Sequence, residues 1–134
     1  MFGEARLFNP DPAAYLPHRF PFLMLDSLTS LDPGSHASAV TRISGFPAGF
    51  PRILMVECVA QLGGIVSISE QGEGGFIASI DHAEFEGDAA DGDTLTVSAR
   101  IIKTFGRLFM LEGFVDRDGC RLLQTRLTLG IGRL

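Results

Sequence analysis

The sequence predicts an α+β domain in which one long apolar helix is wrapped by a curved antiparallel sheet. Three observations support this: residues 51–71 are an apolar segment of helical length, the chain after them alternates between apolar and polar residues, and 46% of the 134 residues are hydrophobic. A helix that is apolar around its whole circumference has to be covered on every side. A sheet supplies most of that cover and a second subunit the rest. We therefore expect one domain over residues 1–134.

The chain before the helix has clear turn and strand signals. Asp11 as N-cap and Pro12 at the first helical position predict a short helix, which Pro17 ends. Prolines keep residues 16–26 extended, and we expect residues 22–25 to form a buried strand-like segment. Alternation over residues 35–43 predicts a strand. A loop of Gly, Pro and Phe, residues 44–51, then leads into the helix.

The chain after the helix reads as a meander of strands. Alternating residues predict strands over 76–85, 94–103, 107–115 and 120–131, the first bent near residues 81–82. Residues 116–119 end in Asp-Gly and predict a hairpin turn. No repeat or internal linker interrupts the pattern.

Charge and cysteine content exclude several classes of function. A net charge of −5 argues against a nucleic-acid partner. Residues 100–134 hold seven of the 11 Lys and Arg residues, so this part could meet an acidic partner or could simply be solvated. No membrane span is expected, because Glu57 and Gln61 interrupt the apolar helix. Two cysteines and no signal-peptide pattern favour a cytoplasmic protein with reduced thiols.

Two polar residues in the middle of the apolar helix are the main candidates for chemistry. Glu57 and Gln61 are four residues apart and so share one helix face. A carboxylate in apolar surroundings has to be paired, neutralised or used. The three histidines are scattered, and no metal site is expected.

Several motifs resemble those of the hot-dog-fold 3-hydroxyacyl-[acyl-carrier-protein] dehydratases of fatty-acid synthesis. Residues 16–26 (LPHRFPFLMLD) are similar to the family's opening motif, and residues 56–61 (VECVAQ) to its central-helix motif. Residues 79–85 (SIDHAEF), followed by Gly92 and Asp93, resemble its next strand and loop. The resemblance covers about residues 12–133 and implies the hot-dog fold.

The resemblance also implies a reaction and a site. Members of this family are lyases that remove water from a 3-hydroxyacyl thioester carried on the phosphopantetheine of acyl carrier protein, with no separate cofactor. They use one His and one acidic residue from two subunits of a dimer, which can assemble further into a trimer of dimers. Glu57 matches the acid, and Gln61 orients Glu57 or the thioester. The corresponding substrate-binding positions are Arg52 and Ile53 at the helix start and Phe46 and Pro47 in the loop before it.

Two positions depart from the family pattern. Arg52 occupies the helix-start position where the family has a small Gly whose N–H contacts the thioester. Gly45 stands before Phe46-Pro47, where the family has its catalytic His. His18 in the opening motif either replaces that group or is a structural loop histidine. Three functions therefore stay open: a dehydratase acting on acyl-carrier-protein or CoA thioesters, a non-catalytic subunit that binds the carrier protein or pairs with an active partner, and a thioesterase in which Glu57 activates water.

Overall fold

The computed structural model describes residues 8–19, 22–68 and 72–133. In chain order the elements are η1 (Pro12–Ala14), β1 (Ser27–Asp32), β2 (His36–Arg42), α1 (Arg52–Ser67), β3 (Glu73–Phe85), β4 (Thr94–Phe105), β5 (Leu108–Arg117) and β6 (Cys120–Arg133). Phe20, Pro21 and residues 69–71, which the predicted opening motif and helix included, lie outside the described residues.

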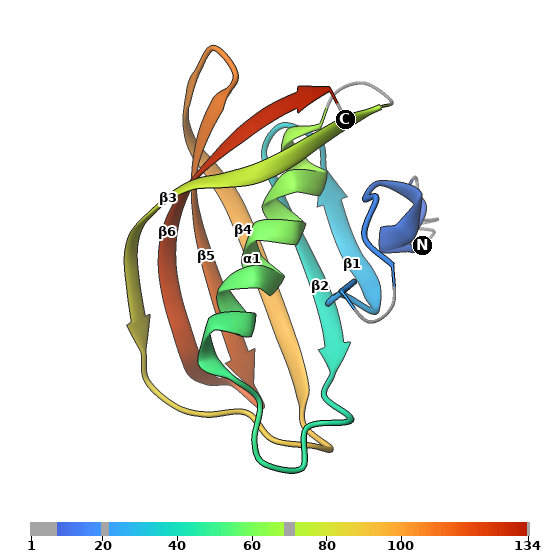
Figure 1. The fold of residues 1–134 in the computed structure, drawn as a ribbon, viewed down its shortest axis with the longest axis vertical. Helices are drawn as coiled ribbons and strands as arrows, with labels where there is room; N and C mark the ends of the chain where they lie inside the picture. Colours follow the sequence, from blue (N-terminus) through green and yellow to red (C-terminus); the bar gives the residue numbers. More distant parts are fainter. Residues whose placement is uncertain (1–7, 20–21, 69–71, 134) are drawn as a thin grey trace, which may run out of the picture.

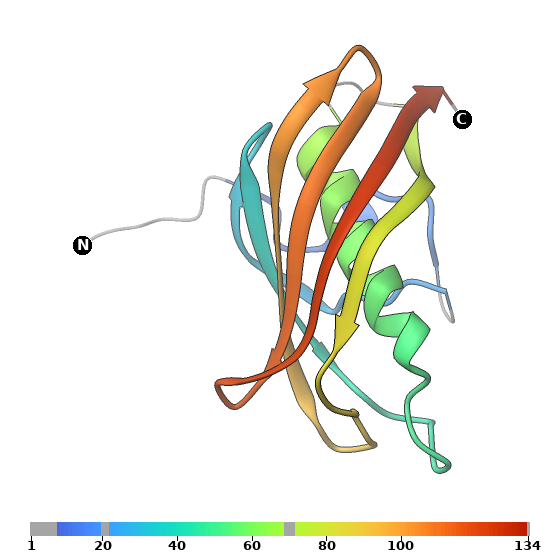
Figure 2. The ribbon, with the colours of Figure 1, turned by 90° about the vertical axis from the view of Figure 1, so that its left-hand side faces the viewer.

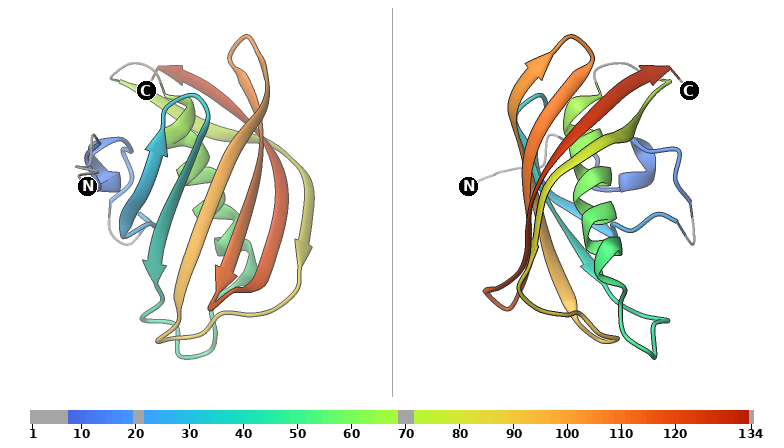
Figure 3. Two further views of the ribbon diagram at one scale, coloured as in Figure 1. Left: turned by 180° about the vertical axis from the view of Figure 1, so that it is seen from behind. Right: turned by 60° about the vertical axis from the view of Figure 1, so that its left-hand side comes forward.

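A six-stranded antiparallel sheet curves around one side of α1 (Figure 1). The strand order is β1-β2-β4-β5-β6-β3, so β1 and β3 are the edges of the sheet. Side views show the sheet on one side of the helix and the N-terminal segment crossing the other (Figures 2 and 3). This is the hot-dog arrangement that the resemblance implies, and it places α1 between the N-terminal segment and β3 (Figure 1).

Helix α1 is buried along most of its length, as its sequence predicts. Every residue from 58 to 67 is buried. Close packing explains Gly63, because a Cβ there would lie 2.4 Å from Cδ2 of Leu111 on β5. The first turn is the exception, since Arg52 and Ile53 are exposed. The helix is therefore apolar all round but not covered all round, and its uncovered part carries Glu57.

The strands follow the predicted alternation. On β6, Leu123, Thr125, Leu127, Leu129 and Ile131 all face the core. The bend expected near residues 81–82 is a register shift between β3 and β6 at Ile80/His82. The hairpin between β5 and β6 turns at Asp118 and Gly119, whose φ values of 51° and 79° are those of a type I′ turn. Asp11 caps η1 by accepting a hydrogen bond from the Ala13 N–H at 2.9 Å.

One prediction about the region before β2 was wrong. Residues 22–25 do not form a buried strand: they lie outside any strand, and Phe22 is 71% exposed. The strand in this region is β1, which begins five residues later in the chain than the apolar run suggested and pairs with β2. Residues 22–24 instead bind through their backbone to a side chain of α1, so their apolar character does not reflect a place in the sheet.

Candidate functional site

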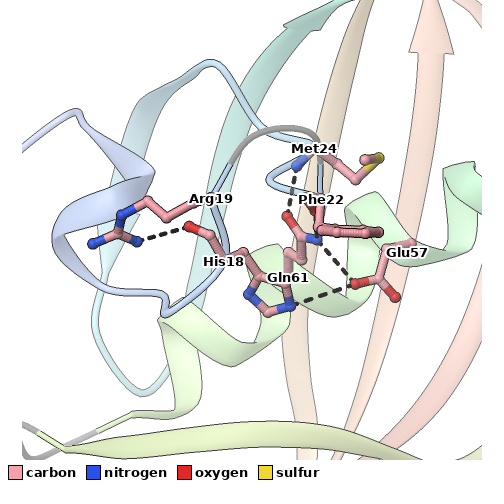
Figure 4. A network of polar contacts seen from close by, with 6 residues as sticks. All are labelled: His18, Arg19, Phe22, Met24, Glu57 and Gln61. Carbon is pink, nitrogen blue, oxygen red and sulfur yellow. Dashed lines mark hydrogen bonds and ion pairs between the residues drawn. The ribbon is translucent and has the colours of Figure 1, made fainter.

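Glu57 lies on the uncovered part of α1, one turn after the helix start. Its side chain is 36% exposed and faces two adjoining cavities, so it is neither sealed in the core nor free in bulk water. The carboxylate accepts a hydrogen bond from Nε2 of Gln61 at 2.9 Å (Figure 4). The four-residue spacing predicted this pairing, which fixes the direction of the carboxylate.

Gln61 holds the segment before β1 against the helix. It is only 2% exposed, and its amide is fully used. Oε1 accepts a hydrogen bond from the Met24 N–H at 2.9 Å, while Nε2 donates to the Phe22 carbonyl at 2.8 Å as well as to Glu57. A buried amide that satisfies two backbone groups is a structural clamp. The same amide therefore orients Glu57 and positions residues 22–24.

His18 reaches Glu57 from the segment that Gln61 anchors. Its Nε2 lies 3.8 Å from Oε2 of Glu57, and its side chain is 29% exposed. Its backbone carbonyl accepts a hydrogen bond from Nη1 of Arg19, which also donates to the Leu16 carbonyl, each at 2.7 Å (Figure 4). Nδ1 of His18 is buried and has no hydrogen-bond partner among the described residues. The structure thus brings together two groups able to exchange protons, Glu57 and His18, within one chain.

The two cavities meet at His18, Glu57 and Ile77. The first, of about 310 Å³, is named here the Gly64 cavity; it is also lined by Leu16, Ala60, Gln61, Gly64, Gly75, Phe76 and Leu129. The second, of about 450 Å³, is the Ile53 cavity, and its other lining residues include Phe22, Met24, Ile53 and Leu54. The Ile53 cavity is mainly apolar with a few polar groups, which is typical of small-molecule sites, and the Gly64 cavity is more mixed.

Of the two predicted site residues at the helix start, Ile53 shares a cavity with Glu57, whereas the side chain of Arg52 does not. Ile53 lines the Ile53 cavity, as expected for a residue at the helix start. The side chain of Arg52 turns away and donates from Nε to Oδ1 of Asp88 at 2.6 Å. This hydrogen bond raises the pKa of Arg52 and lowers the pKa of Asp88. Arg52 is therefore committed to a surface ion pair rather than to the cavities.

Phe46 and Pro47 belong to a separate part of the surface. Phe46 packs edge-to-face on Phe50 with ring centroids 4.8 Å apart and lines a third cavity with Gly45, Thr41 and Arg42. Gly45 has a φ of +85°, a conformation that side chains with a Cβ rarely adopt. At the position where the family has its His, this chain therefore has a backbone conformation that favours glycine.

The remaining nucleophilic and metal-binding candidates are not placed for chemistry. Cys58 is fully buried, and burial, followed by the negative charges of Glu57 and Asp26, raises the pKa of its thiol to about 12. Such a thiol is inert. His36 and His82 lie on strands at a sheet surface, 3.8 Å from Asp32 and 4.0 Å from Glu84. Among the residues that the structure describes, no three His, Cys, Asp or Glu side chains cluster as metal ligands would.

Sequence reasoning missed the residues that shape the Gly64 cavity. Ala60 and Gly64 lie three and seven residues after Glu57, on the same helix face, and this spacing was the available signal. Gly75, Ile77 and Leu129 come from β3 and β6, and only the fold brings them to the helix. No helix in the described part of the chain has the length and hydrophobicity needed to cross a membrane.

Solved structures of low sequence identity share this fold. The dehydratase heterocomplex ApeI:P from Xenorhabdus doucetiae aligns with a TM-score of 0.78 at 15% identity, covering 96% of this chain and 93% of the other. The protein smu.793 from Streptococcus mutans, bound to acetyl CoA, aligns with a TM-score of 0.71 at 18% identity over 89% and 97%. A hypothetical thioesterase from Streptococcus pneumoniae, solved with coenzyme A, gives 0.66 at 14% identity over 79% and 84%.

Similarity in sequence is more specific. No protein-family model matches the chain. The 3-hydroxyacyl-[acyl-carrier-protein] dehydratase FabZ of Geobacillus thermodenitrificans is 30% identical over 132 residues, covering 89% of this chain and 91% of the relative. FabZ of Bacillus subtilis is 30% identical over 130 residues, covering 87% and 92%. With the hot-dog fold and a Glu–Gln pair on its central helix, the chain belongs to the FabZ family of 3-hydroxyacyl-[acyl-carrier-protein] dehydratases.

Proposed function

We propose that the protein interconverts 3-hydroxyacyl and trans-2-enoyl thioesters, with Glu57 and His18 as its acid–base pair. The observation that carries the proposal is the 3.8 Å approach of His18 Nε2 to Glu57 Oε2 at the junction of two cavities. The relatives named FabZ are dehydratases of this substrate class. Gly45 cannot supply the family's His, and His18 is the histidine that shares a cavity with Glu57 among the described residues.

Dehydration needs one base and one acid on the same substrate. The C2–H bond breaks as the base takes the proton, the C3–O bond breaks as the acid protonates the leaving hydroxyl, and the C2=C3 bond forms as water departs. Glu57 and His18 line the same two cavities, so one substrate lying in this space can present C2 and C3 to both groups. Gln61 fixes the carboxylate direction through its 2.9 Å hydrogen bond and takes no part in proton transfer.

The start of α1 is suited to polarising the thioester carbonyl. The first N–H groups of a helix have no intrahelical partner, and Pro51 provides no side-chain cap. Ile53 lines the same cavity as Glu57 and His18. A carbonyl oxygen placed beside the N–H groups of Arg52 and Ile53 would be stabilised as it gains negative charge. The thioester then lies in the Ile53 cavity, one helical turn before Glu57.

The acyl group is carried on phosphopantetheine, from acyl carrier protein or from CoA, with no further cofactor. Acyl carrier protein appears in the names of the FabZ relatives, and acetyl CoA is bound in the S. mutans neighbour. Both carriers end in the same thioester, so the reaction chemistry is the same. Two unpaired cysteines, Cys58 and Cys120, fit action in the reducing cytoplasm.

We also propose that the active form is a homodimer at least, joined along β3. This strand is 13 residues long, lies at a sheet edge, and exposes Phe76 (63%) and Ile80. Long apolar edge strands invite pairing with another chain. Ile53 at the open start of α1 is 57% exposed and would be covered by the same partner. Light scattering after size exclusion should give at least twice the 14.4 kDa chain mass; a monomer at micromolar concentration would contradict the proposal.

The central test is enoyl interconversion by site variants. Crotonyl and 3-hydroxybutyryl thioesters are incubated with the protein, and enoyl absorbance is followed. We expect Glu57→Gln, which keeps the size of the side chain, and His18→Asn each to lower kcat by at least about 100-fold, the usual contribution of one acid–base group. Unchanged melting temperatures would show that the loss is chemical. Full activity of Glu57→Gln would remove the proposed mechanism, and an unchanged rate in His18→Asn would leave His18 a structural role.

A second candidate is a subunit that pairs with a partner chain carrying the missing His. It is favoured by Gly45, and the X. doucetiae neighbour is a dehydratase heterocomplex. If the family His is required, Gly45→His should raise the rate, because a Cβ at this position meets no atom within 4 Å, although the φ of +85° opposes any side chain. If Gly45→His does not raise the rate, and the native protein is active and needs His18, the Glu57–His18 pair within one chain is favoured instead. Release of free thiol without enoyl formation would instead identify a thioesterase.

A further inference from the structure

The segment that carries His18 is folded around one residue, Arg19. Nη1 of Arg19 donates hydrogen bonds to the carbonyls of Leu16 and His18, each at 2.7 Å. The backbone carbonyl of Arg19 accepts hydrogen bonds from the N–H groups of Phe22 at 2.7 Å and Leu23 at 3.1 Å. Four hydrogen bonds within residues 16–23 therefore converge on Arg19.

Among the described residues, the guanidinium of Arg19 makes hydrogen bonds to backbone carbonyls alone. The residue is exposed, yet it belongs to none of the ion pairs in the described part of the chain. It also lines neither cavity beside Glu57. A charged donor bonds a carbonyl more strongly than a neutral one does, and Nη1 has a hydrogen for each of the two carbonyls. The role of Arg19 therefore lies in the backbone that it holds.

The imidazole of His18 depends on this backbone for its direction. Its Nε2 is 3.8 Å from Oε2 of Glu57, which is beyond hydrogen-bond distance. Its Nδ1 is buried and has no hydrogen-bond partner among the described residues. Figure 4 shows the carbonyl of His18 turned to Arg19 and the imidazole turned to Glu57. The ring is thus aimed by the His18 backbone and by packing, since no hydrogen bond in the described part of the chain holds the ring itself.

Leu16 connects this arrangement to the core. It is 5% exposed and belongs to the main apolar cluster. Because one nitrogen of Arg19 binds the carbonyls of both Leu16 and His18, it ties the backbone of His18 to a residue with a fixed place. Gln61 holds residues 22–24, at the other end of the segment. Loss of the guanidinium would release the His18 carbonyl and leave the Gln61 contacts intact.

We propose that Arg19 is a positioning residue for the proposed reaction, on which this inference rests. Its two hydrogen bonds hold the backbone of His18 so that the imidazole faces Glu57. Arg19 touches neither the reacting groups nor the cavity walls, so its removal should slow the chemical step and leave substrate binding unchanged. A displacement of about 1 Å at a catalytic group can cost about 100-fold in rate.

The test is a double-mutant cycle on the rate of enoyl interconversion. Arg19→Met removes the donors and keeps a long side chain, and we expect kcat to fall by roughly 10- to 100-fold with KM within about threefold of native. In His18→Asn the group that Arg19 positions is already absent. Adding Arg19→Met to that variant should therefore lower the remaining rate by no more than about twofold. General damage to the fold would lower the rate equally in both backgrounds.

Two further variants separate positioning from the loss of a surface charge. Because a single nitrogen makes both hydrogen bonds, a lysine ammonium can replace it, and Arg19→Lys should stay within about threefold of the native kcat. Arg126→Met is the matched control, because Arg126 is exposed on β6, lines neither cavity and has no side-chain hydrogen bond among the described residues. Its kcat should stay within about twofold of native. Arg19→Ala replaces Arg19→Met if that variant does not fold.

A second measurement reports the geometry without any reaction. The ring protons of His18 and the side-chain protons of Glu57 should give nuclear Overhauser contacts in the native protein, because Nε2 and Oε2 lie 3.8 Å apart. We expect Arg19→Met to lose these contacts, and Arg19→Lys and Arg126→Met to keep them.

Three results would each overturn the inference: Overhauser contacts that persist in Arg19→Met, a kcat of Arg19→Met within about twofold of native, or an equal loss of rate with and without His18. A native protein that does not interconvert enoyl thioesters would refute the proposed reaction. The Overhauser contacts alone would then decide whether Arg19 positions His18.

Discussion

Replacing Gln61 by Leu should destabilise the fold and misdirect the carboxylate at the same time. Gln61 is the buried amide whose Oε1 accepts from Met24 N and whose Nε2 donates to the Phe22 carbonyl. Leucine has a similar size and cannot form either bond. The change therefore leaves one N–H and one carbonyl without their partner next to the core, and it frees Glu57 from its fixed orientation.

The magnitude follows from the number of backbone groups left unpaired. A buried polar group that loses its partner costs about 1–3 kcal/mol. Two such groups, at Phe22 and Met24, give a loss of about 2–6 kcal/mol, and the lower half of this range applies because water can reach the exposed side of Phe22. For a chain of this size that corresponds to a fall in melting temperature of roughly 10 °C. Glu57 is partly exposed, so water can replace its hydrogen bond and it adds little to this cost.

Thermal unfolding followed by circular dichroism measures the effect directly. Gln124→Leu is the matched control, because Gln124 lies on β6 outside the core and has no hydrogen bond of its side chain among the described residues. Such a surface change is expected to stay within about 0.5 kcal/mol. A melting temperature of Gln61→Leu within about 2 °C of the native protein would refute the claim that the Gln61 amide holds residues 22–24 against α1. It would then also be wrong that Gln61 positions the segment that presents His18.

Two further predictions concern the thiols and the acid stability of the fold. The pKa of Cys58 is raised to about 12 by burial. In the native protein a thiol reagent should therefore react rapidly with Cys120 alone, and with Cys58 only after unfolding. Rapid reaction of both thiols in the native protein would contradict this prediction. The pKa of Asp93 is lowered, first by the hydrogen bond from the Ala90 N–H. The Asp93 carboxylate therefore stabilises the fold at pH values above its unfolded-state pKa of about 3.9, and this contribution is lost as the pH falls below that value. Asp93→Asn has no such contribution to lose, so the urea midpoint of the variant should fall less steeply below about pH 4 than that of the native protein.

Local periodicity explains why most elements could be predicted. An apolar run with no polar face has few options other than a buried helix, and α1 begins within one residue of the predicted start at Pro51. The strands after it were recognisable because one side of each strand packs on that helix, which forces apolar residues into every second position. Asp118 and Gly119 fixed the β5–β6 hairpin, because both tolerate the positive φ of a type I′ turn.

Long-range hydrogen bonds explain what could not be predicted. Residues 22–24 are apolar, and the pattern alone placed them in a strand. Their position is set by Gln61, which is 37 residues from Met24 in sequence, and no local signal reports such a pairing. For the same reason, the sequence named Glu57, Gln61 and His18 from motifs but could not say that the three meet. Arg52 is named for the N–H group at the helix start, and the sequence could not say that its side chain pairs with Asp88 on a distant loop.

The approach of His18 to Glu57 rests on backbone atoms more than on side-chain identity. Gln61 binds the N–H of Met24 and the carbonyl of Phe22, and Arg19 binds the carbonyls of Leu16 and His18. Backbone groups are present in every residue, apart from the N–H that proline lacks. The side chains around His18 can therefore vary and reshape the two cavities without disturbing the clamp. Apart from His18, Glu57 and Gln61 themselves, the side chains that line the two cavities can thus change while the backbone contacts that bring His18 to Glu57 stay in place.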